Sequence, residues 1–446
     1  MRRAPALGLL AFLIACGDGN QGPQAPDGSN LGWSGPQRIG QAAGAGGMQV
    51  ALDAQGTGVA VWQEPSGTLA ATLGSTGTWS PAERLDGETA PRALDAAGSG
   101  FFHLAWRGVD GAAAAILARR FVPGQGWTAP VRVSQGGQTD SFLDDASRPD
   151  VAVAPDGSAF VAWRQIAGGD HRIWAARHTL AGWDAPDLLA TATGNASGVQ
   201  VAVDGVGNAT CAWLAFDGTA VTLRAARFTP AGGWRPEEDL DRHVGLGDMS
   251  HAPAVAMAGT AEAFVVVPTA AFRLPRGELM AYRTSGGAWE PPAQIAELTP
   301  AAPGTSFQVA LDADASGAAT VAWLLSGTGP NDLWANRYVR GSGWGMPRRL
   351  ETRTTNAYTP AVAAAEGGAW VVWLQAETPQ GGVELNRVWS SVFTGAAWSA
   401  PMAINTDERA QPPDLDATMG GRALAAWSQG PFQNETPWAN RFGATP

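Results

Sequence analysis

Short apolar runs with an alternating pattern recur along most of the chain, and a turn signal follows many of them. Val201-Ala202-Val203 and Ala159-Phe160-Val161-Ala162-Trp163 are typical runs, and Asp53-Ala54-Gln55-Gly56 is a typical turn. Alternation with a period of two, interrupted by Asp and Gly, is typical of short β-strands joined by tight turns. The pattern therefore predicts an all-β chain.

Two sequence marks divide the chain into repeats. The first is a Gly followed by five residues and a Trp, found at Gly56/Trp62, Gly100/Trp106, Gly157/Trp163, Gly207/Trp213, Gly317/Trp323, Gly367/Trp373 and Gly421/Trp427. An eighth copy, Ala261/Val267, has lost both marked residues but keeps the flanking pattern. The second mark is a Trp with a Pro two or three positions later, found at Trp79, Trp127, Trp183, Trp234, Trp289, Trp344 and Trp398, with one further copy at Trp33. Because each repeat of this kind is one supersecondary unit, the marks predict eight equivalent units.

The units have the size and strand content of propeller blades. Each contains four short strands, and residues 31–446 number 416, which gives 416/8 = 52 residues per unit. The last unit ends after its third strand, Trp438–Phe442, whereas an unassigned fourth strand, Gly32–Ile39, precedes the first unit. We therefore predict an eight-bladed β-propeller of four-stranded blades, closed by an N-terminal strand that completes the last blade. An open β-solenoid or two smaller propellers are the alternatives.

The first 30 residues differ from the repeats. Arg2 and Arg3 precede an apolar run that ends in Leu13-Ile14-Ala15-Cys16. This ending resembles the lipobox of bacterial lipoproteins, which implies a signal peptide at 1–15 and a lipidated Cys16 at the head of a flexible tether, 16–30. The residue after Cys16 is Gly17 rather than Asp, and this resembles the pattern of lipoproteins that are sorted to the Gram-negative outer membrane. We expect an outer-membrane lipoprotein on the periplasmic or surface side, held by its lipid alone; an ordinary secretory signal with a chance Cys is the alternative.

Composition narrows the possible partners. All 29 basic residues are Arg, and 40 acidic residues give a formal net charge of −11. This balance argues against a nucleic-acid phosphate track and against a basic membrane-surface patch. Cys211 is the only cysteine besides Cys16 and lies in an apolar run, so we expect it buried and free. We expect a monomer.

The repeated residues have structural explanations. We interpret the second-strand Trp residues as packing between blades, with each indole N–H finding a partner, and the Gly residues as turn positions of positive φ. A third-strand Arg series, expected to pair with acidic or carbonyl groups of adjacent blades, comprises Arg120, Arg177, Arg227, Arg283, Arg337 and Arg441.

Recognition is expected where the repeat is broken, on the loops from fourth to first and from second to third strands. Three such segments supply the candidate binding face: Asp140, Asp144, Asp145, Arg148 and Asp150; Asp170 and His171; and His243, Asp248 and His251. No cofactor is expected, although the carboxylate-rich loop leaves calcium open and the His/Asp/His segment suits zinc in residue type. Asp312–Gly317 has the front half of a calcium-loop pattern, but the closing acidic position falls on Trp323, so we interpret the segment as an enlarged strand turn.

The repeats also resemble sialidase propellers in their Asp/Gly turns and Trp pattern over residues 48–442. The sialidase repeat signature Ser-x-Asp-x-Gly-x-Thr-Trp occurs in no unit, and Phe272-Arg273-Leu274-Pro275, which resembles the sialidase Arg motif, lies in the middle of the ring. The resemblance implies a Tyr nucleophile, for which the chain offers Tyr282, Tyr338 and Tyr358. Without a catalytic signature, we predict a binding or scaffold module for a protein or glycan partner. A sialidase-like or other carbohydrate-active enzyme is the alternative.

Overall fold

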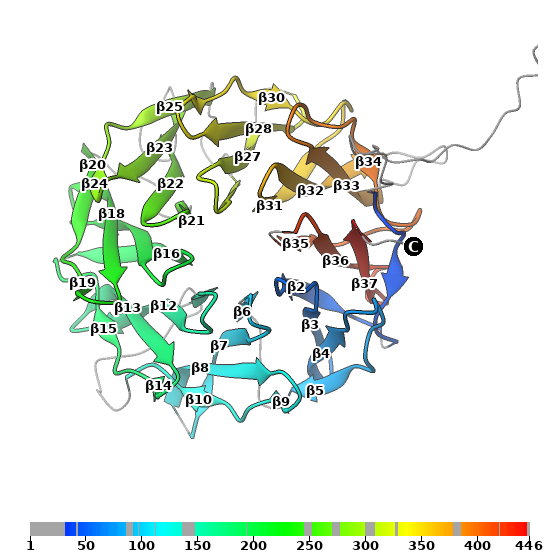
Figure 1. Cartoon of the computed structure of the whole chain (residues 1–446), viewed down its shortest axis with the longest axis horizontal. Coiled ribbons are helices and arrows are strands. Elements are labelled where there is room, and N and C mark those ends of the chain that lie inside the picture. The colour runs from blue at the N-terminus through cyan, green and yellow to red at the C-terminus, as the bar shows by residue number, and fades with distance from the viewer. Residues whose placement is uncertain are drawn as a thin grey trace, which may run out of the picture.

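A computed structural model describes residues 32–443, apart from 42, 86–91, 97, 112, 136–147, 193, 245–251, 270–276, 299–307, 326–328, 378–384 and 419. These residues form eight antiparallel sheets arranged as blades around a central axis (Figure 1). They contain no α-helix, and none of their segments is a helix able to cross a membrane. The predicted eight-bladed propeller is confirmed.

Each blade begins at the axis and runs outward. The innermost strands are β2 (Gly46–Leu52), β6 (Arg92–Ala96), β11 (Asp150–Val153), β16 (Asn195–Val203), β21 (Ala254–Ala258), β26 (Val309–Ala313), β31 (Ala357–Ala365) and β35 (Asp414–Ala417), in blades 1 to 8. The second strands are β3 (Gly58–Glu64), β7 (Phe102–Asp110), β12 (Ala159–Ala167), β17 (Ala209–Phe216), β22 (Glu262–Pro268), β27 (Ala319–Leu325), β32 (Gly368–Glu377) and β36 (Ala423–Gln429). The third strands are β4 (Gly67–Leu73), β8 (Ala113–Val122), β13 (Asp170–Thr179), β18 (Ala220–Thr229), β23 (Gly277–Ser285), β28 (Asp332–Val339), β33 (Leu385–Phe393) and β37 (Thr436–Phe442).

The outermost strand is split in most blades. In blade 3, Trp183 pairs with His178 and, after Pro186, Leu188 pairs with Trp174 of the same third strand. The interruption has a simple cause, because Pro has no N–H to donate to the ladder. The outer strands are β5 (Glu83–Leu85); β9 (Gly126–Trp127) and β10 (Val131–Arg132); β14 (Gly182–Trp183) and β15 (Asp187–Leu188); β19 (Gly233–Trp234) and β20 (Glu238–Val244); β24 (Ala288–Trp289) and β25 (Ala293–Leu298); β29 (Gly343–Trp344) and β30 (Arg348–Arg349); and β34 (Met402–Ala403).

The two ends of the chain share blade 8. Strand β1 (Gln37–Arg38) pairs antiparallel with β37, so that the sheet order is β1-β37-β36-β35. Trp33 forms a bridge to Phe442, and the Ser34 N–H donates to the Arg441 carbonyl at 2.8 Å. The predicted closure by an N-terminal strand is confirmed.

The marked Trp residues join neighbouring blades. Trp163 is fully buried and packs in one cluster with Ala105 and Ile116 of blade 2, and the equivalent Trp of other blades packs in the same way. The predicted packing role is confirmed. The indole N–H donates to a Glu or Gln two positions later in four blades, at Trp62, Trp163, Trp373 and Trp427.

The expectation that every indole finds a partner is wrong. Nε1 of Trp106 and Nε1 of Trp213 have no hydrogen-bond partner in the described part of the chain. Their second-next residues are Gly108 and Ala215, which offer no side-chain acceptor. The marked Gly residues, in contrast, all have positive φ, and Ala261 adopts the same conformation at φ 64°.

Trp323 of blade 6 also lacks a Glu or Gln two positions later. Its side chain is 2% exposed and packs with Val266 and Leu279 of blade 5, so its packing role is confirmed. The residue two positions later is Leu325, whose side chain has no acceptor for the indole N–H. The Glu or Gln that accepts the indole N–H in four blades is therefore replaced by a hydrocarbon side chain in blade 6.

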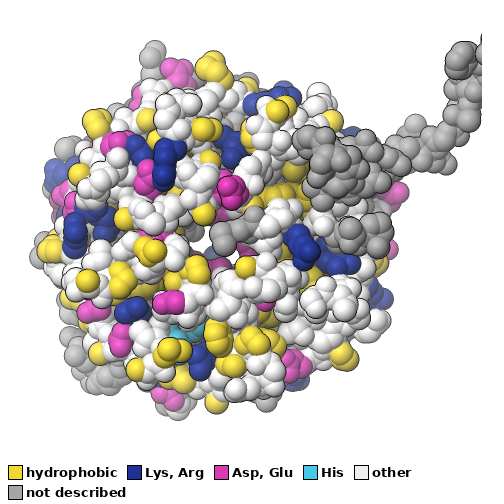
Figure 2. Space-filling view, in the orientation of Figure 1, with side chains coloured by type: hydrophobic (Ala, Val, Ile, Leu, Met, Phe, Trp, Pro, Cys, Tyr) yellow, Lys and Arg dark blue, Asp and Glu magenta, His cyan; other side chains and the backbone are white. Residues whose placement is uncertain are grey.

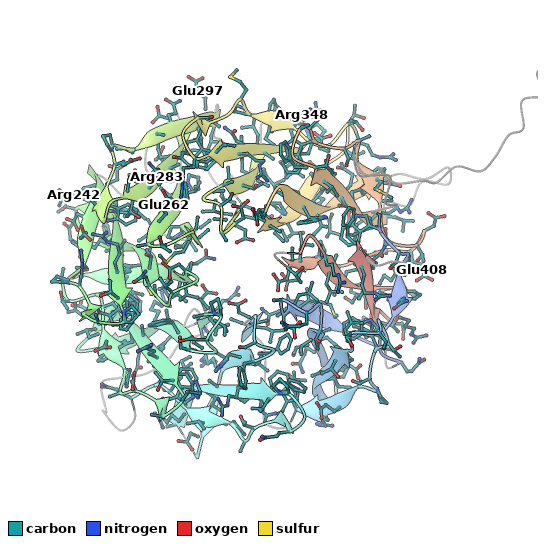
Figure 3. All side chains as sticks on the ribbon, viewed as in Figure 1. Arg242, Glu262, Arg283, Glu297, Arg348 and Glu408 are labelled. Atoms are coloured by element: carbon teal, nitrogen blue, oxygen red, sulfur yellow. The ribbon has the colours of Figure 1, made fainter. Side chains whose placement is uncertain are left out.

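The third-strand Arg residues divide into two groups. Arg227 donates to the Gly287 carbonyl of the next blade at 2.7 Å, and Arg337 lies 3.3 Å from the Gly368 carbonyl of its next blade. Arg283 pairs at 2.8 Å with Glu262 of its own blade (Figure 3). Pairing with an adjacent blade is thus confirmed for Arg227 and Arg337 and wrong for Arg283, whose partner belongs to its own blade. The guanidinium groups of Arg120, Arg177 and Arg441 have no ion pair or hydrogen bond to any described residue.

Candidate functional site

Several residues of the predicted binding face lie outside the described residues: Asp140, Asp144, Asp145, Asp248 and His251. His243 is placed only through its backbone, which pairs with Val221 inside β20 rather than in a loop. A binding role for these residues stays a prediction.

Two of the described members of that face contact neighbouring residues, and a third is exposed. Arg148 is exposed. Asp170 pairs with Arg172 at 2.8 Å, next to the turn between β12 and β13. The backbone N–H of His171 donates to Asn195 of blade 4.

Asp150 belongs to a set of carboxylates carried by the innermost strands, and these strands surround the central axis (Figure 1). Each accepts an N–H from the innermost strand of the next blade, at 2.6–2.9 Å: Asp95 from Val153, Asp150 from Val201, Asp312 from Ala364, Asp414 from Val50 and Asp416 from Leu52. These N–H groups lie at the free inner edge of a sheet, where no strand can satisfy them. The carboxylates therefore fasten adjacent blades together.

Burial changes the acidity of this inner set. It raises the pKa of Asp95 to about 7 and the pKa values of Asp150, Asp312 and Asp414 to about 6. Repulsion from Asp150 and Asp312 adds to the shift of Asp95. The described residues contain no group of three or more His, Cys, Asp or Glu side chains placed to hold a metal ion. Asp314 accepts the N–H groups of Ser316 and Ala318, so Asp312–Gly317 forms the predicted strand turn.

The repeat is broken most clearly between blades 2 and 3. His103 of β7 contacts His178 of β13 with ring centroids 5.0 Å apart, and His178 contacts Trp183 at 5.1 Å. In three other grooves the same positions hold aromatic side chains that do not titrate near neutral pH: Phe160, Phe228 and Trp234; Phe264, Tyr338 and Trp344; and Trp370, Phe442 and Trp33. Two imidazoles have replaced less polar rings at this one contact.

A cleft accompanies the histidine pair. It has a volume of about 680 Å³ and is lined by His103, His178, Trp183, Arg120 and the half-exposed Val131. The equivalent groove between blades 6 and 7, which contains Phe393 in place of His178, has a volume of about 300 Å³. Figure 2 shows histidine (cyan) beside basic side chains (dark blue) in the lower part of the ring, over β8 and β13.

The cleft lies toward the face opposite the predicted one. His103 is the second residue of β7, just after the turn that joins the first and second strands, and His178 precedes the turn between β13 and β14. We therefore place the candidate functional site at the outer rim, on the side of these short turns.

Both imidazoles are neutral at neutral pH. Burial lowers the pKa of His103 to about 3, helped by the nearby His178 and Arg120, and burial with the charge of Arg120 lowers the pKa of His178 to about 4. No hydrogen bond of normal geometry reaches either ring nitrogen of His103 or Nδ1 of His178 in the described part of the chain, although the Gly157 carbonyl is near enough to favour a charged His103 slightly. Each neutral ring has one donor and one acceptor, and both nitrogens of His103 and Nδ1 of His178 are buried beneath the cleft.

Two of the three tyrosines that the sialidase resemblance offers lie in the packing between blades. Tyr282 is buried between blades 4 and 5, where its hydroxyl donates to Asp241 at 2.5 Å. Tyr338 is buried against Phe264. The segment 272–275 lies outside the described residues.

Known proteins with a similar fold are distant in sequence. No protein-family model and no curated protein matches this sequence. Among solved structures, the polysaccharide lyase Uly1 is similar at 9% identity with a TM-score of 0.49, over 78% of this chain and 89% of that one. The Hadza microbial sialidase Hz136 matches at 11% identity and a TM-score of 0.38, over 75% and 64%. A six-bladed lectin from Aleuria aurantia matches at 16% identity and 0.39, over 68% and 95%.

Proposed function

We propose that this protein is a lipid-anchored β-propeller of the cell envelope that binds a glycan partner in the cleft between blades 2 and 3. The observation that carries the proposal is the replacement of a less polar aromatic contact by His103 and His178 in a groove more than twice as large as its equivalent. Neither change improves blade packing, because buried polar atoms without partners destabilise a fold.

The shape of the cleft favours a glycan over a protein surface. Protein interfaces of ordinary size bury about 800 Å² on each partner and are broad, whereas small-ligand sites are concave pockets of about 300–1,000 Å³. The cleft falls in the second class. Its walls combine apolar surface from Trp183 and Val131 with polar side chains such as Arg120, which suits a sugar ring with one apolar face and several hydroxyls.

The anchor is tested by replacing the residue to be acylated. In the Cys16→Ala variant, acylation is expected to be lost and the protein to leave the membrane fraction, because no other membrane attachment is proposed. Membrane fractionation and mass spectrometry of the N-terminal peptide provide the readouts. A variant that keeps its lipid and stays with the membranes would refute the anchoring proposal.

Glycan binding is tested with a panel of oligosaccharides and the full-length protein in detergent. The double variant His103→Phe/His178→Phe is expected to lose binding without losing thermal stability, because Phe occupies the third-strand position in blades 4, 7 and 8. His171→Phe, outside the cleft, serves as the control. Binding by the double variant at wild-type affinity, or no binding by the wild type, contradicts the proposal. Turnover of an oligosaccharide would favour the carbohydrate-active enzyme.

A further inference from the structure

One cationic group in the cleft has no anionic partner. Arg120 is half-buried, and its guanidinium makes no ion pair or hydrogen bond with any described residue. Its contact within the protein is the face of Phe101, at 5.7 Å. The same group is close enough to His103 and His178 to lower the pKa of both imidazoles.

The equivalent Arg of blade 6 has two polar partners that Arg120 lacks. Arg337 donates to Thr320 at 2.9 Å, lies 3.9 Å from the Asp314 carboxylate and packs over Phe393 at 4.5 Å. In blade 2, His103 stands at the position of Thr320, and the sequence has Ala97 at the position of Asp314. Substitution of both partners has left Arg120 available to a ligand.

The lining of the cleft carries an excess of positive charge. Arg120 and Arg132 line it from blade 2, whereas the Arg119 side chain packs over Trp106 on the other face of β8. Asp184 is the single acidic side chain of the lining, on the exposed rim of blade 3. Arg132 is partly neutralised by Asp110 at 3.3 Å. The positive lining contrasts with the formal net charge of −11 of the whole chain.

We propose that the cleft between blades 2 and 3 selects saccharides that carry a carboxylate or sulfate group, with Arg120 as the partner of that anion. This inference rests on the proposed glycan-binding function and specifies its ligand class. A guanidinium matches the planar carboxylate, or two sulfate oxygens, with paired hydrogen bonds that are stronger than neutral ones. Trp183 then packs on the sugar ring, above the buried pair His103 and His178.

The inference is tested with tetrasaccharides of three kinds: neutral, uronic-acid and sulfated. Binding to the full-length protein in detergent is measured by calorimetry at constant ionic strength, because an exposed ion pair weakens as salt rises. We expect at least one acidic tetrasaccharide to bind more tightly than the neutral one. Arg120→Gln is expected to weaken that binding by about tenfold or more while leaving affinity for the neutral sugar unchanged.

Arg177→Gln is the matched control. Arg177 occupies the same third-strand position in blade 3 and also has no ion pair to a described residue, but it lies between Phe160 and Phe228 in a groove without histidine. Its substitution is expected to leave acidic-sugar affinity unchanged.

The outcomes separate the two proposals. Equal binding of neutral and acidic sugars, or acidic-sugar binding that Arg120→Gln does not weaken, overturns the anion inference and leaves the glycan-binding function standing. Failure of all three saccharides to bind contradicts the proposed function itself. Binding of an acidic peptide without any saccharide would also overturn the inference, since the partner would then be a protein. Separate affinities for the uronic-acid and sulfated sugars identify which anion is preferred.

Discussion

At the scale of single residues, the repeat makes each exception informative. The turn between first and second strands needs a left-handed residue, and seven blades supply Gly there. Blade 5 supplies Ala261 in the same conformation, and its N–H still donates to Asp204 of blade 4 at 2.6 Å. A Cβ in the left-handed region is unfavourable, so blade 5 carries strain that its neighbours avoid.

Relief of this strain gives a stability prediction. Ala261→Gly is expected to raise the free energy of unfolding by about 0.5–1 kcal/mol, the difference between left-handed strain and the extra entropy of an unfolded Gly. The reverse change, Gly421→Ala, is the matched control, because a Cβ there meets open space and adds only the conformational cost. It should lower stability by a similar amount. Urea denaturation measures both; a less stable Ala261→Gly variant would contradict the account.

The histidine pair shows why part of the site could not be predicted from the sequence. His103 and His178 are separated by 178 − 103 = 75 positions and belong to different blades. Neither has a motif of its own, and their meaning depends on the ring contact that joins them. Alignment of the repeats at their Trp residues would have found the signal, because His103 then falls at the position of Phe160 and His178 at that of Phe228.

At the scale of elements, most of the fold could be predicted from the marked Gly and Trp residues. Gly and Trp positions predicted the strands and their order because the same contacts recur in every blade. Asp150 was assigned to a binding loop because the sequence around it is acidic and irregular, but it is the first residue of β11. The Asp150 carboxylate accepts the N–H of Val201 in the neighbouring blade. This contact helps to define where β11 begins, and it cannot be predicted from the sequence around Asp150 alone.

The closing strand provides the prediction at this scale. Deletion of Gly32–Ile39 should lower the melting temperature and promote aggregation, because it removes the partner of β37 and exposes a strand edge. Deletion of 17–30 is the control, because it also shortens the chain but removes no described contact. It should leave the melting temperature unchanged. Differential scanning fluorimetry and light scattering compare the two. Equal melting temperatures would mean that the strand does not hold the ring closed.

At the scale of the whole molecule, the inner carboxylates and the histidine pair respond to acid in opposite ways. Asp95 has a folded pKa of about 7 and Asp150, Asp312 and Asp414 have folded pKa values of about 6, and burial also raises the pKa of Asp416 well above its ordinary value of 3.8. The folded protein therefore binds more protons than the unfolded chain between the ordinary and the raised values. Stability from these groups therefore falls as pH rises through that window. His103 and His178, with folded pKa values of about 3 and 4, contribute stability that is lost as pH falls below 6.5.

The inner carboxylates, which are the larger group, should determine how the free energy of unfolding changes with pH. The urea midpoint is expected to rise when the pH is lowered from about 7.5 to about 5, since the inner carboxylates outnumber the two histidines. Asp95→Asn should flatten this dependence, because burial raises the pKa of Asp95 to about 7, inside the range that is scanned. Substitution of both histidines by Phe should steepen it. A midpoint that falls steadily on acidification of the wild type would show that the inner carboxylates are ionised in the folded protein throughout this range.

The shared last blade also sets an order of events during synthesis. The Gly35 N–H donates to Asn440 at 3.0 Å across 405 sequence positions, so the strand made first must wait for the strand made last. At ordinary translation rates this interval is about 20–80 s. During that time the ring is open, and any chain that ends early stays open. Closure therefore depends on synthesis through β37: a chain that stops before Thr436 contains no strand with which β1 can pair.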